Sequence, residues 1–234
     1  EQGYDVVVLE KNNEIGGVWY NKSYPGIQLQ TTKKSYAFSD FPHFPQTKLY
    51  PDGKEVLHYI QSYIKHFNLN DLFLLGCSVS DVKFINNKWN VIYIQNKKTK
   101  TIVSDYLIIS TGMYNSSKPL FKDPECLKIA TKNIYSVEQL QNNIEILKGK
   151  KIIIFGNGPT GCDLATTAYN LNAKKITIIY RSDRWLFRRY LWDKYSADNF
   201  LTRFSMIIAN FFPNILFIVI VIILYYTFYV LGHG

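Results

Sequence analysis

The chain has 234 residues, 47% of them hydrophobic, so it can bury the core of one large or two modest domains and is not a disordered chain. Its 27 Lys and Arg outnumber its 18 Asp and Glu, but the lysines are scattered rather than aligned along one element, which argues against a nucleic-acid partner. The three cysteines form no CxxC pair and the four histidines show no metal-ligand spacing, so we expect a reducing compartment and no metal site.

The first predicted strand, Asp5 to Glu10, ends in an acid and precedes a loop rich in Gly, Asn and Pro at 12–26. An acid at this position binds the ribose of a dinucleotide, and it normally follows a glycine loop by about 20 residues. The chain leaves no room for that loop, so we expect it to begin inside a domain. The alternative is that Glu10 is an ordinary carboxylate at the end of a strand.

The middle of the chain predicts one helix and a group of strands. Apolar residues recur at helical spacing from Lys54 to Asn68, which indicates an amphipathic helix. Four strands should then form a small antiparallel meander: Leu72–Leu75, Val79–Phe84, Lys88–Gln95 and Thr101–Ser110. A polar, proline-containing stretch follows Gly112 and predicts a crossover between two domains.

A complete βαβ unit is predicted next, with a strand at Lys150–Phe155, a helix from about Pro159 to Leu171, and a strand ending at Arg181. Gly156, Gly158 and Gly161 form G-x-G-x-x-G between the first strand and the helix. In that context the first glycine turns the chain, the second lets the backbone approach a pyrophosphate, and the third lets helix pack on strand. A chance glycine-rich turn is the alternative.

Arg181 predicts which dinucleotide binds. An acid at the end of this strand would bind a ribose 2′-hydroxyl, whereas a guanidinium suits a 2′-phosphate, so we expect NADPH rather than NADH. Arg184, Arg188 and Arg189 follow within the same nine residues. The alternative is that Arg181 is a surface arginine, in which case NADH and NADPH would bind equally.

Four motifs in the same order resemble the flavin-containing monooxygenase family. They are EKNNEIGGVW at Glu10–Trp19, LQT with FSDFP at Leu29–Pro42, STG at Ser110–Gly112, and GNGPTGCD at Gly156–Asp163. The resemblance runs from residue 1 to about Pro213. It implies an FAD domain interrupted by an NADPH domain, in a chain truncated at both ends and inactive by itself.

The resemblance also implies the site residues. Those expected to bind FAD are Glu10, Lys11, Gly16, Gly17, Trp19, Thr111 and Gly112. Those expected to bind NADPH are Gly156, Asn157, Gly158, Pro159, Thr160, Gly161 and Arg181. Gln30 stands where many members have an asparagine that faces the flavin, and it is the candidate catalytic amide.

The implied reaction is of the N,N-dimethylaniline monooxygenase type, in which amines or sulfides are oxygenated by dioxygen through a C4a-hydroperoxyflavin. The partners would then be a small nucleophilic substrate and dioxygen. The family's F-x-G-x-x-x-H signature is replaced at Ile129, Thr131 and Tyr135. Two alternatives therefore stay open: an NADPH oxidase that releases peroxide, and a non-catalytic dinucleotide-binding relative.

The C-terminal segment 206–231 is strongly hydrophobic, and no charged residue lies between Phe204 and Gly232. We expect it to associate with a membrane of the endoplasmic reticulum, and Arg188, Arg189, Lys194 and Arg203 on its N-terminal side to keep the catalytic part cytosolic. A buried helix or strand of a core is the alternative.

The predicted architecture is α/β. It has two Rossmann-like units, the FAD unit being incomplete, with an antiparallel β-meander and a C-terminal hydrophobic helix. The expected divisions are a partial FAD domain at 1–118, a crossover at 119–148, a partial NADPH domain at 149–205 and the hydrophobic segment at 206–231.

Overall fold

A computed structural model of the chain describes residues 3–112, 133–141, 143–183, 190–191, 195–196 and 210. The predictions for Ile129, Thr131 and the basic residues Arg184, Arg188, Arg189, Lys194 and Arg203 lie outside these residues. So does segment 206–231 apart from residue 210. Within the described part of the chain, no helix combines the length and the apolar character needed to cross a bilayer.

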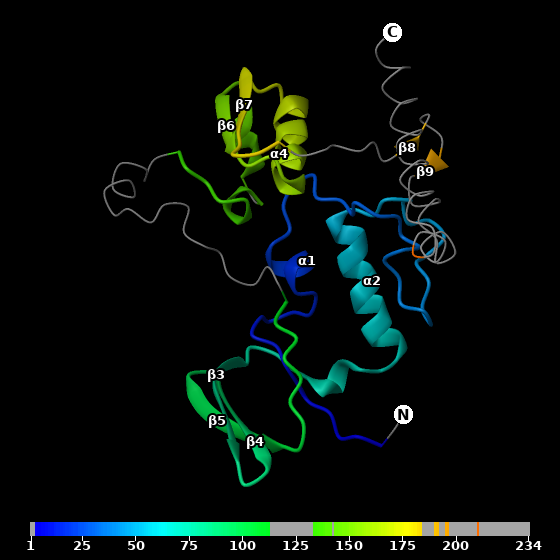
Figure 1. The fold of residues 1–234 in the computed structure, drawn as a ribbon, viewed down its shortest axis with the longest axis vertical. Helices are drawn as coiled ribbons and strands as arrows, with labels where there is room; N and C mark the ends of the chain where they lie inside the picture. The colour runs from blue at the N-terminus through cyan, green and yellow to red at the C-terminus, as the bar shows by residue number, and fades with distance from the viewer. Residues whose placement is uncertain are drawn as a thin grey trace.

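The predicted βαβ unit is present. Strands β6 (Lys151–Phe155) and β7 (Lys175–Ile179) pair in parallel, and helix α4 (Pro159–Asn170) connects them (Figure 1). A core of Leu140, Ile154 and Leu164 joins the strands, the helix and the short 3-10 helices η2 (Glu138–Leu140) and η3 (Ile144–Leu147). The opposite face of the two strands leaves Ile153, Phe155 and Ile179 exposed among the described residues.

The first strand is shorter than predicted and has an unexpected partner. Strand β1 (Val8–Leu9) pairs in parallel with β2 (Phe73–Leu74), so the prediction that Leu72–Leu75 joins the meander is wrong. Backbone hydrogen bonds from the Glu10 amide to the Leu74 carbonyl (3.0 Å) and from the Cys77 amide to the Glu10 carbonyl (2.8 Å) extend the pairing. The partner is more than sixty residues away in sequence, and local periodicity does not reveal such a pairing.

The meander contains three antiparallel strands, β3 (Ser78–Ile85), β4 (Lys88–Gln95) and β5 (Lys98–Ser104). Its two-residue turns, at 86–87 and 96–97, have positive φ at both positions, the geometry that matches the twist of paired strands. The predicted strand Thr101–Ser110 is corrected to β5, because the turn at 96–97 sets its start and pairing with β4 ends at Ser104.

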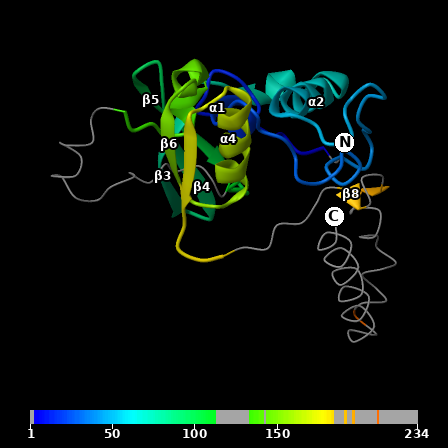
Figure 2. The same ribbon diagram turned by 90° about the horizontal axis from the view of Figure 1, so that it is seen from above.

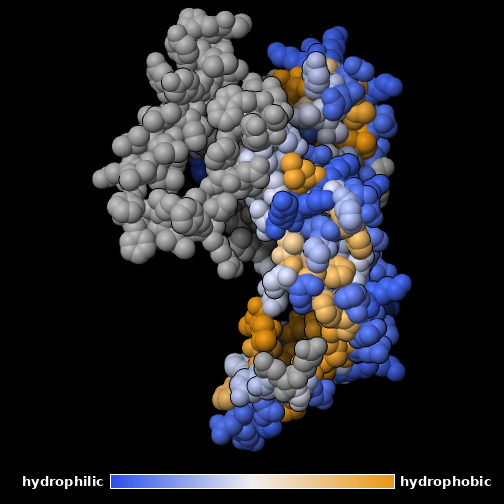
Figure 3. All heavy atoms as spheres, turned by 90° about the vertical axis from the view of Figure 1, so that its right-hand side faces the viewer, coloured by the Kyte–Doolittle hydropathy of each residue, from blue (hydrophilic) through white to orange (hydrophobic). Residues whose placement is uncertain are grey.

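Beyond β5 the chain continues as an apolar segment without a strand partner among the described residues. Tyr106, Ile108 and Ile109 are 78%, 85% and 74% exposed. In the space-filling view, apolar surface is visible in the lower half of the molecule above a hydrophilic tip, and again near the upper end (Figure 3).

The predicted amphipathic helix is confirmed as α2 (Gly53–His66), which follows the short helix α1 (Val18–Asn21). Aromatic residues of the FSDFP segment pack on α2, where the buried Tyr59 accepts a hydrogen bond from the Phe38 amide (2.8 Å) and donates one to the Phe41 carbonyl (2.5 Å). Helix α2 and the βαβ unit occupy different parts of the molecule in both ribbon views (Figures 1 and 2).

The remaining elements are short: the 3-10 helix η1 (Asn70–Leu72) and the antiparallel pair β8 (Tyr190–Leu191) and β9 (Tyr195–Ser196). The Tyr50 hydroxyl lies 2.8 Å from Ser196 Oγ, which joins this pair to the segment before α2.

Candidate dinucleotide-binding site

The glycine turn after β6 fixes the ends of the two parallel strands relative to each other. Gly156 has a φ of 105°, in the region that favours glycine, and its amide donates to the Ile179 carbonyl at 2.8 Å. The chain therefore leaves β6 beside the end of β7 and turns directly into α4. The first glycine has the predicted role.

The other two glycines of the motif differ in their surroundings. A Cβ on Gly161 would overlap the carbonyl oxygen of Gly156, so helix α4 approaches the turn as closely as only glycine allows. A Cβ on Gly158 would meet no atom within 4 Å. Gly161 is thus needed for packing, whereas Gly158 leaves the start of the helix open to a ligand.

The N-terminus of α4 is the candidate anion-binding element of the site. Gly158 is its N-cap, no side chain caps the helix, and Pro159 has no amide hydrogen to satisfy. The amides of Thr160 and Gly161 are in the first turn and have no intrahelical acceptor. Unpaired amides and the helix dipole together favour a bound anion such as a pyrophosphate.

An open cavity of about 520 Å³ adjoins this helix start. It is lined by the ends of β6 and β7, the glycine turn and the residues that follow β7: Phe155, Gly156, Asn157, Gly158, Ile179, Tyr180, Arg181 and Ser182. The structure therefore brings four of the seven predicted NADPH-binding residues together around one cavity: Gly156, Asn157, Gly158 and Arg181.

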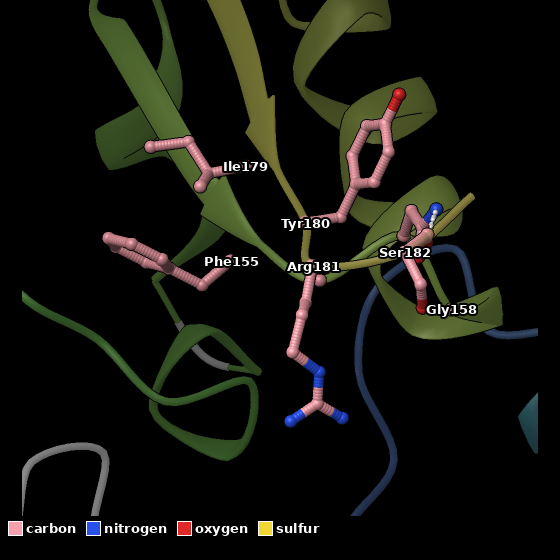
Figure 4. Close-up of a pocket in the computed structure, with 8 residues that line it drawn as sticks. Phe155, Gly158, Ile179, Tyr180, Arg181 and Ser182 are labelled. Carbon is pink, nitrogen blue, oxygen red and sulfur yellow. Dashed lines mark hydrogen bonds between the residues drawn. The ribbon is translucent and has the colours of Figure 1, made fainter.

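The guanidinium of Arg181 is directed away from Tyr180 (Figure 4). It forms neither an ion pair nor a hydrogen bond with any residue in the described ranges. The nearby acid Asp183 is hydrogen-bonded to the Tyr180 hydroxyl, and this bond and the carboxylate charge raise the pKa of Tyr180. Arg181 is thus available to an anionic ligand.

Asn157 has a contact that the sequence did not predict. Its side-chain amide donates to the Ser182 carbonyl at 3.1 Å and so links the glycine turn to the segment after β7.

Glu10 is held in place by a residue that sequence reasoning missed. One of its carboxylate oxygens, Oε1, accepts hydrogen bonds from the Asn12 backbone amide (2.8 Å) and from Asn12 Nδ2 (2.7 Å). The other oxygen has no partner among the described residues. An asparagine two residues after the acid is the signal that could have identified this support, since Asn side chains bond backbone and polar groups nearby.

The glycines after Glu10 also adopt conformations that favour glycine. Gly16 has a φ of 140°, and a Cβ there would overlap Leu57 Cδ1, while Gly17 has a φ of 54° and precedes α1. The Trp19 indole donates to the Tyr36 hydroxyl at 3.0 Å. The two glycines and the Trp19 hydrogen bond therefore define the conformation of the loop. The role of its residues toward FAD stays a prediction.

The remaining predicted residues are exposed. Lys11, Gln30, Thr111 and Gly112 all lie on the surface. Their role toward the flavin stays a prediction.

Comparison with known proteins identifies similar chains. The model of the family described as flavin-binding monooxygenase-like matches residues 1–223. Flavin-containing monooxygenase 5 of Cavia porcellus is 28% identical over 229 residues, a match that covers 90% of this chain and 42% of that protein. The chain thus spans less than half the length of this relative.

Solved structures share the fold. Tmm from Pelagibacter sp. aligns with a TM-score of 0.64 at 21% identity, covering 78% of this chain and 46% of that one. OTEMO in complex with FAD and NADP aligns with a TM-score of 0.65 at 21% identity, covering 78% of this chain and 35% of that one.

Proposed function

Because the chain belongs to the flavin-binding monooxygenase-like family, we propose that it carries part of the FAD site and most of the NADPH nucleotide site of a monooxygenase. The proposed reaction consumes NADPH, a proton, dioxygen and a soft nucleophile such as an amine or sulfide. It yields NADP⁺, water and the N- or S-oxide, so one oxygen atom reaches the substrate and the other leaves as water.

The single observation that carries the proposal is the open start of helix α4 beside Arg181, which has no ion pair or hydrogen bond among the described residues. The first-turn amides would hold the pyrophosphate of NADPH, and the guanidinium would hold its 2′-phosphate. The fit is supported by the packing, since Gly161 has no room for a Cβ while Gly158 leaves the approach clear. OTEMO, which shares the fold, has been crystallised with both FAD and NADP.

On the FAD side, Glu10 would accept a hydrogen bond from the adenosine ribose, with Asn12 holding the carboxylate in position. Gly16 and Gly17 would let the backbone approach the cofactor closely. Bound FAD supplies the redox chemistry that activates dioxygen, and the protein supplies binding, orientation and exclusion of water. The proposal requires no catalytic acid-base pair from this chain.

The test uses the protein that carries this chain, loaded with FAD. Without oxygen, NADPH should reduce the flavin and so bleach the absorbance of oxidised flavin at about 450 nm. After oxygen and an alkyl aryl sulfide are added, sulfoxide should form in equal amount to the NADPH consumed. Peroxide in place of sulfoxide would indicate the NADPH oxidase, and absence of bleaching would contradict the proposal.

We further propose that segment 206–231 associates with a membrane of the endoplasmic reticulum and leaves the catalytic part cytosolic. The support is its hydrophobicity and the basic residues on its N-terminal side. Alkaline carbonate should leave the protein in the membrane pellet, whereas release into the supernatant would contradict the proposal.

A further inference from the structure

A tight turn follows the loop that begins at Glu10. The Ile27 amide donates to the Tyr24 carbonyl at 3.1 Å, Pro25 takes the first central position, and Gly26 takes the second with a φ of 88°. These are the residues and the conformation of a type II turn. The sequence YPGI therefore fixes the direction in which Tyr24 leaves the loop.

This turn rests on helix α4 through side chains on one helical face. The Tyr24 hydroxyl donates to Asp163 Oδ2 at 3.0 Å and lies 3.4 Å from Thr160 Oγ1. Thr167 Oγ1 lies 3.4 Å from the Pro25 carbonyl and 2.9 Å from the Asp163 carbonyl, so its single hydrogen is shared between the turn and the helix. The three α4 residues are three and four apart, which places them on the same face of the helix.

The fit between the turn and the helix is close. A Cβ on Gly26 would overlap Thr167 Oγ1, so only glycine allows this approach. The Tyr24 ring packs against the core that contains Ile154 and Leu164, and it is therefore shared between the loop and the βαβ unit. Burial, with the Asp163 charge, raises the pKa of Tyr24 to about 12 despite the opposing hydrogen bond with Thr160, so the hydroxyl stays a donor at neutral pH.

We propose that Tyr24 is a positioning residue that couples the loop carrying Gly16, Gly17 and Trp19 to the phosphate-binding end of α4. The inference rests on the proposed NADPH site and extends it. A dinucleotide that orders the first turn of α4 should also order this loop, because Thr160 belongs to that turn and lies beside the Tyr24 hydroxyl.

The loop is internally connected by backbone hydrogen bonds. The Tyr20 and Asn21 amides donate to the Gly17 carbonyl at 3.2 and 3.0 Å, and the Ile27 amide closes the turn. Ordering at Tyr24 should therefore slow the opening of hydrogen bonds on both sides of it. NADP⁺ should therefore change amide exchange in the loop, which it would not do if Tyr24 only stabilised the local structure.

Hydrogen exchange of the FAD-loaded protein that carries this chain, measured with and without NADP⁺, tests the coupling. In the wild type, NADP⁺ should slow exchange in the first turns of α4 and should slow exchange of the Tyr20, Asn21 and Ile27 amides by about fivefold, as expected when one hydrogen bond is stabilised. In Tyr24→Phe, which keeps the ring, protection of α4 should persist while protection of the loop is lost.

Tyr169→Phe is the matched control, because Tyr169 lies on the same helix and is 75% exposed. It should behave as the wild type. Thr167→Val keeps the side-chain volume and removes the hydroxyl, which is bonded to the Pro25 carbonyl and, within α4, to the Asp163 carbonyl. It should lose part of the loop protection, and it replaces Tyr24→Phe if that variant does not fold.

Two results would overturn this inference and leave the proposed NADPH site intact. One is loop protection that is unchanged in Tyr24→Phe, and the other is NADP⁺ protection in the wild type that is confined to α4. If NADP⁺ protects neither α4 nor the loop in the wild type, the proposed NADPH site fails and the inference fails with it.

Discussion

Two helix starts in this chain have nearly the same backbone and opposite chemistry. The N-cap of α2 is Asp52, with φ −80° and ψ 172°, and the N-cap of α4 is Gly158, with φ −75° and ψ 178°. Asp52 Oδ1 accepts from the Lys54 and Glu55 amides at 3.0 Å each, and Glu55 accepts from the Asp52 amide at 3.0 Å. Helix α2 satisfies its own first turn, whereas α4 does not.

The difference shows that the residue at the cap decides whether the first-turn amides are satisfied by a side chain of the protein. Every helix begins with unpaired amides and a partial positive charge. A capping box uses them within the protein, as in α2. A glycine followed by proline leaves them to an external anion, as in α4, and the exposed Arg181 adds a full positive charge at the same cavity.

The largest predicted effect comes from making α4 resemble α2. Gly158→Asp places a carboxylate at a cap whose backbone already has the required conformation and whose Cβ position is free. NADP⁺ affinity should fall more than about 100-fold, because the carboxylate accepts hydrogen bonds from the first-turn amides of α4 and repels the pyrophosphate. Isothermal titration measures the loss.

The same variant should unfold at an equal or slightly higher urea concentration than the wild type, since Asp caps a helix slightly better than Gly. Undiminished NADP⁺ binding in a folded Gly158→Asp variant would show that this helix start is not the phosphate site.

Two alanine variants distinguish the packing role of Gly161 from the open approach at Gly158. Gly161→Ala should destabilise the chain by about 1 to 3 kcal/mol, the range for overpacking, because its Cβ would meet the Gly156 backbone rather than a flexible side chain. Gly158→Ala should leave the urea midpoint within about 0.5 kcal/mol of the wild type, as is usual where no contact is disturbed. Equal destabilisation by both changes would contradict the distinct roles of the two glycines.

A smaller effect is expected at α2. Asp52→Ala should reduce the free energy of unfolding by about 1 kcal/mol through loss of the cap, with no change in NADP⁺ affinity. Burial raises the pKa of Asp52, but hydrogen bonds from Lys48 and the Glu55 and Lys54 amides outweigh it and lower the pKa below its usual value of 3.8.

The Asp52 contribution should therefore be fully present above about pH 4 and decline as the pH falls through the lowered pKa. Urea unfolding at several pH values should show the gap between wild type and Asp52→Ala closing in acid. A gap that widened in acid, or a loss of NADP⁺ binding at neutral pH, would contradict this assignment.

Sequence reasoning predicted best what is encoded locally. The elements β6, α4 and β7 lie within about thirty residues, and each shows its own periodicity or glycine spacing. The partner of β1 could not be predicted, because Val8 pairs with Phe73 and nothing in either short segment specifies the other. The end of β5 was missed for a related reason, since the apolar run continues past the point where pairing stops.

At the candidate site, sequence predicted the residues that a motif names and missed those that support them. Gly156 and Arg181 were predicted from their spacing, but Asn12 and Tyr24 act through hydrogen bonds that depend on how the chain turns. Tyr24 and Asp163 are far apart in sequence and meet only because the YPGI turn aims the tyrosine at α4.

The central claim, that the α4 start and Arg181 form a site for a 2′-phosphorylated dinucleotide, is tested most directly by comparing the affinities of NADP⁺ and NAD⁺. The wild type should bind NADP⁺ about 10 to 100 times more tightly, as expected for charge-assisted hydrogen bonds to a phosphate. In Arg181→Ala that preference should disappear while NAD⁺ affinity stays unchanged. Equal affinities in the wild type, or a preference that survives in Arg181→Ala, would contradict the claim.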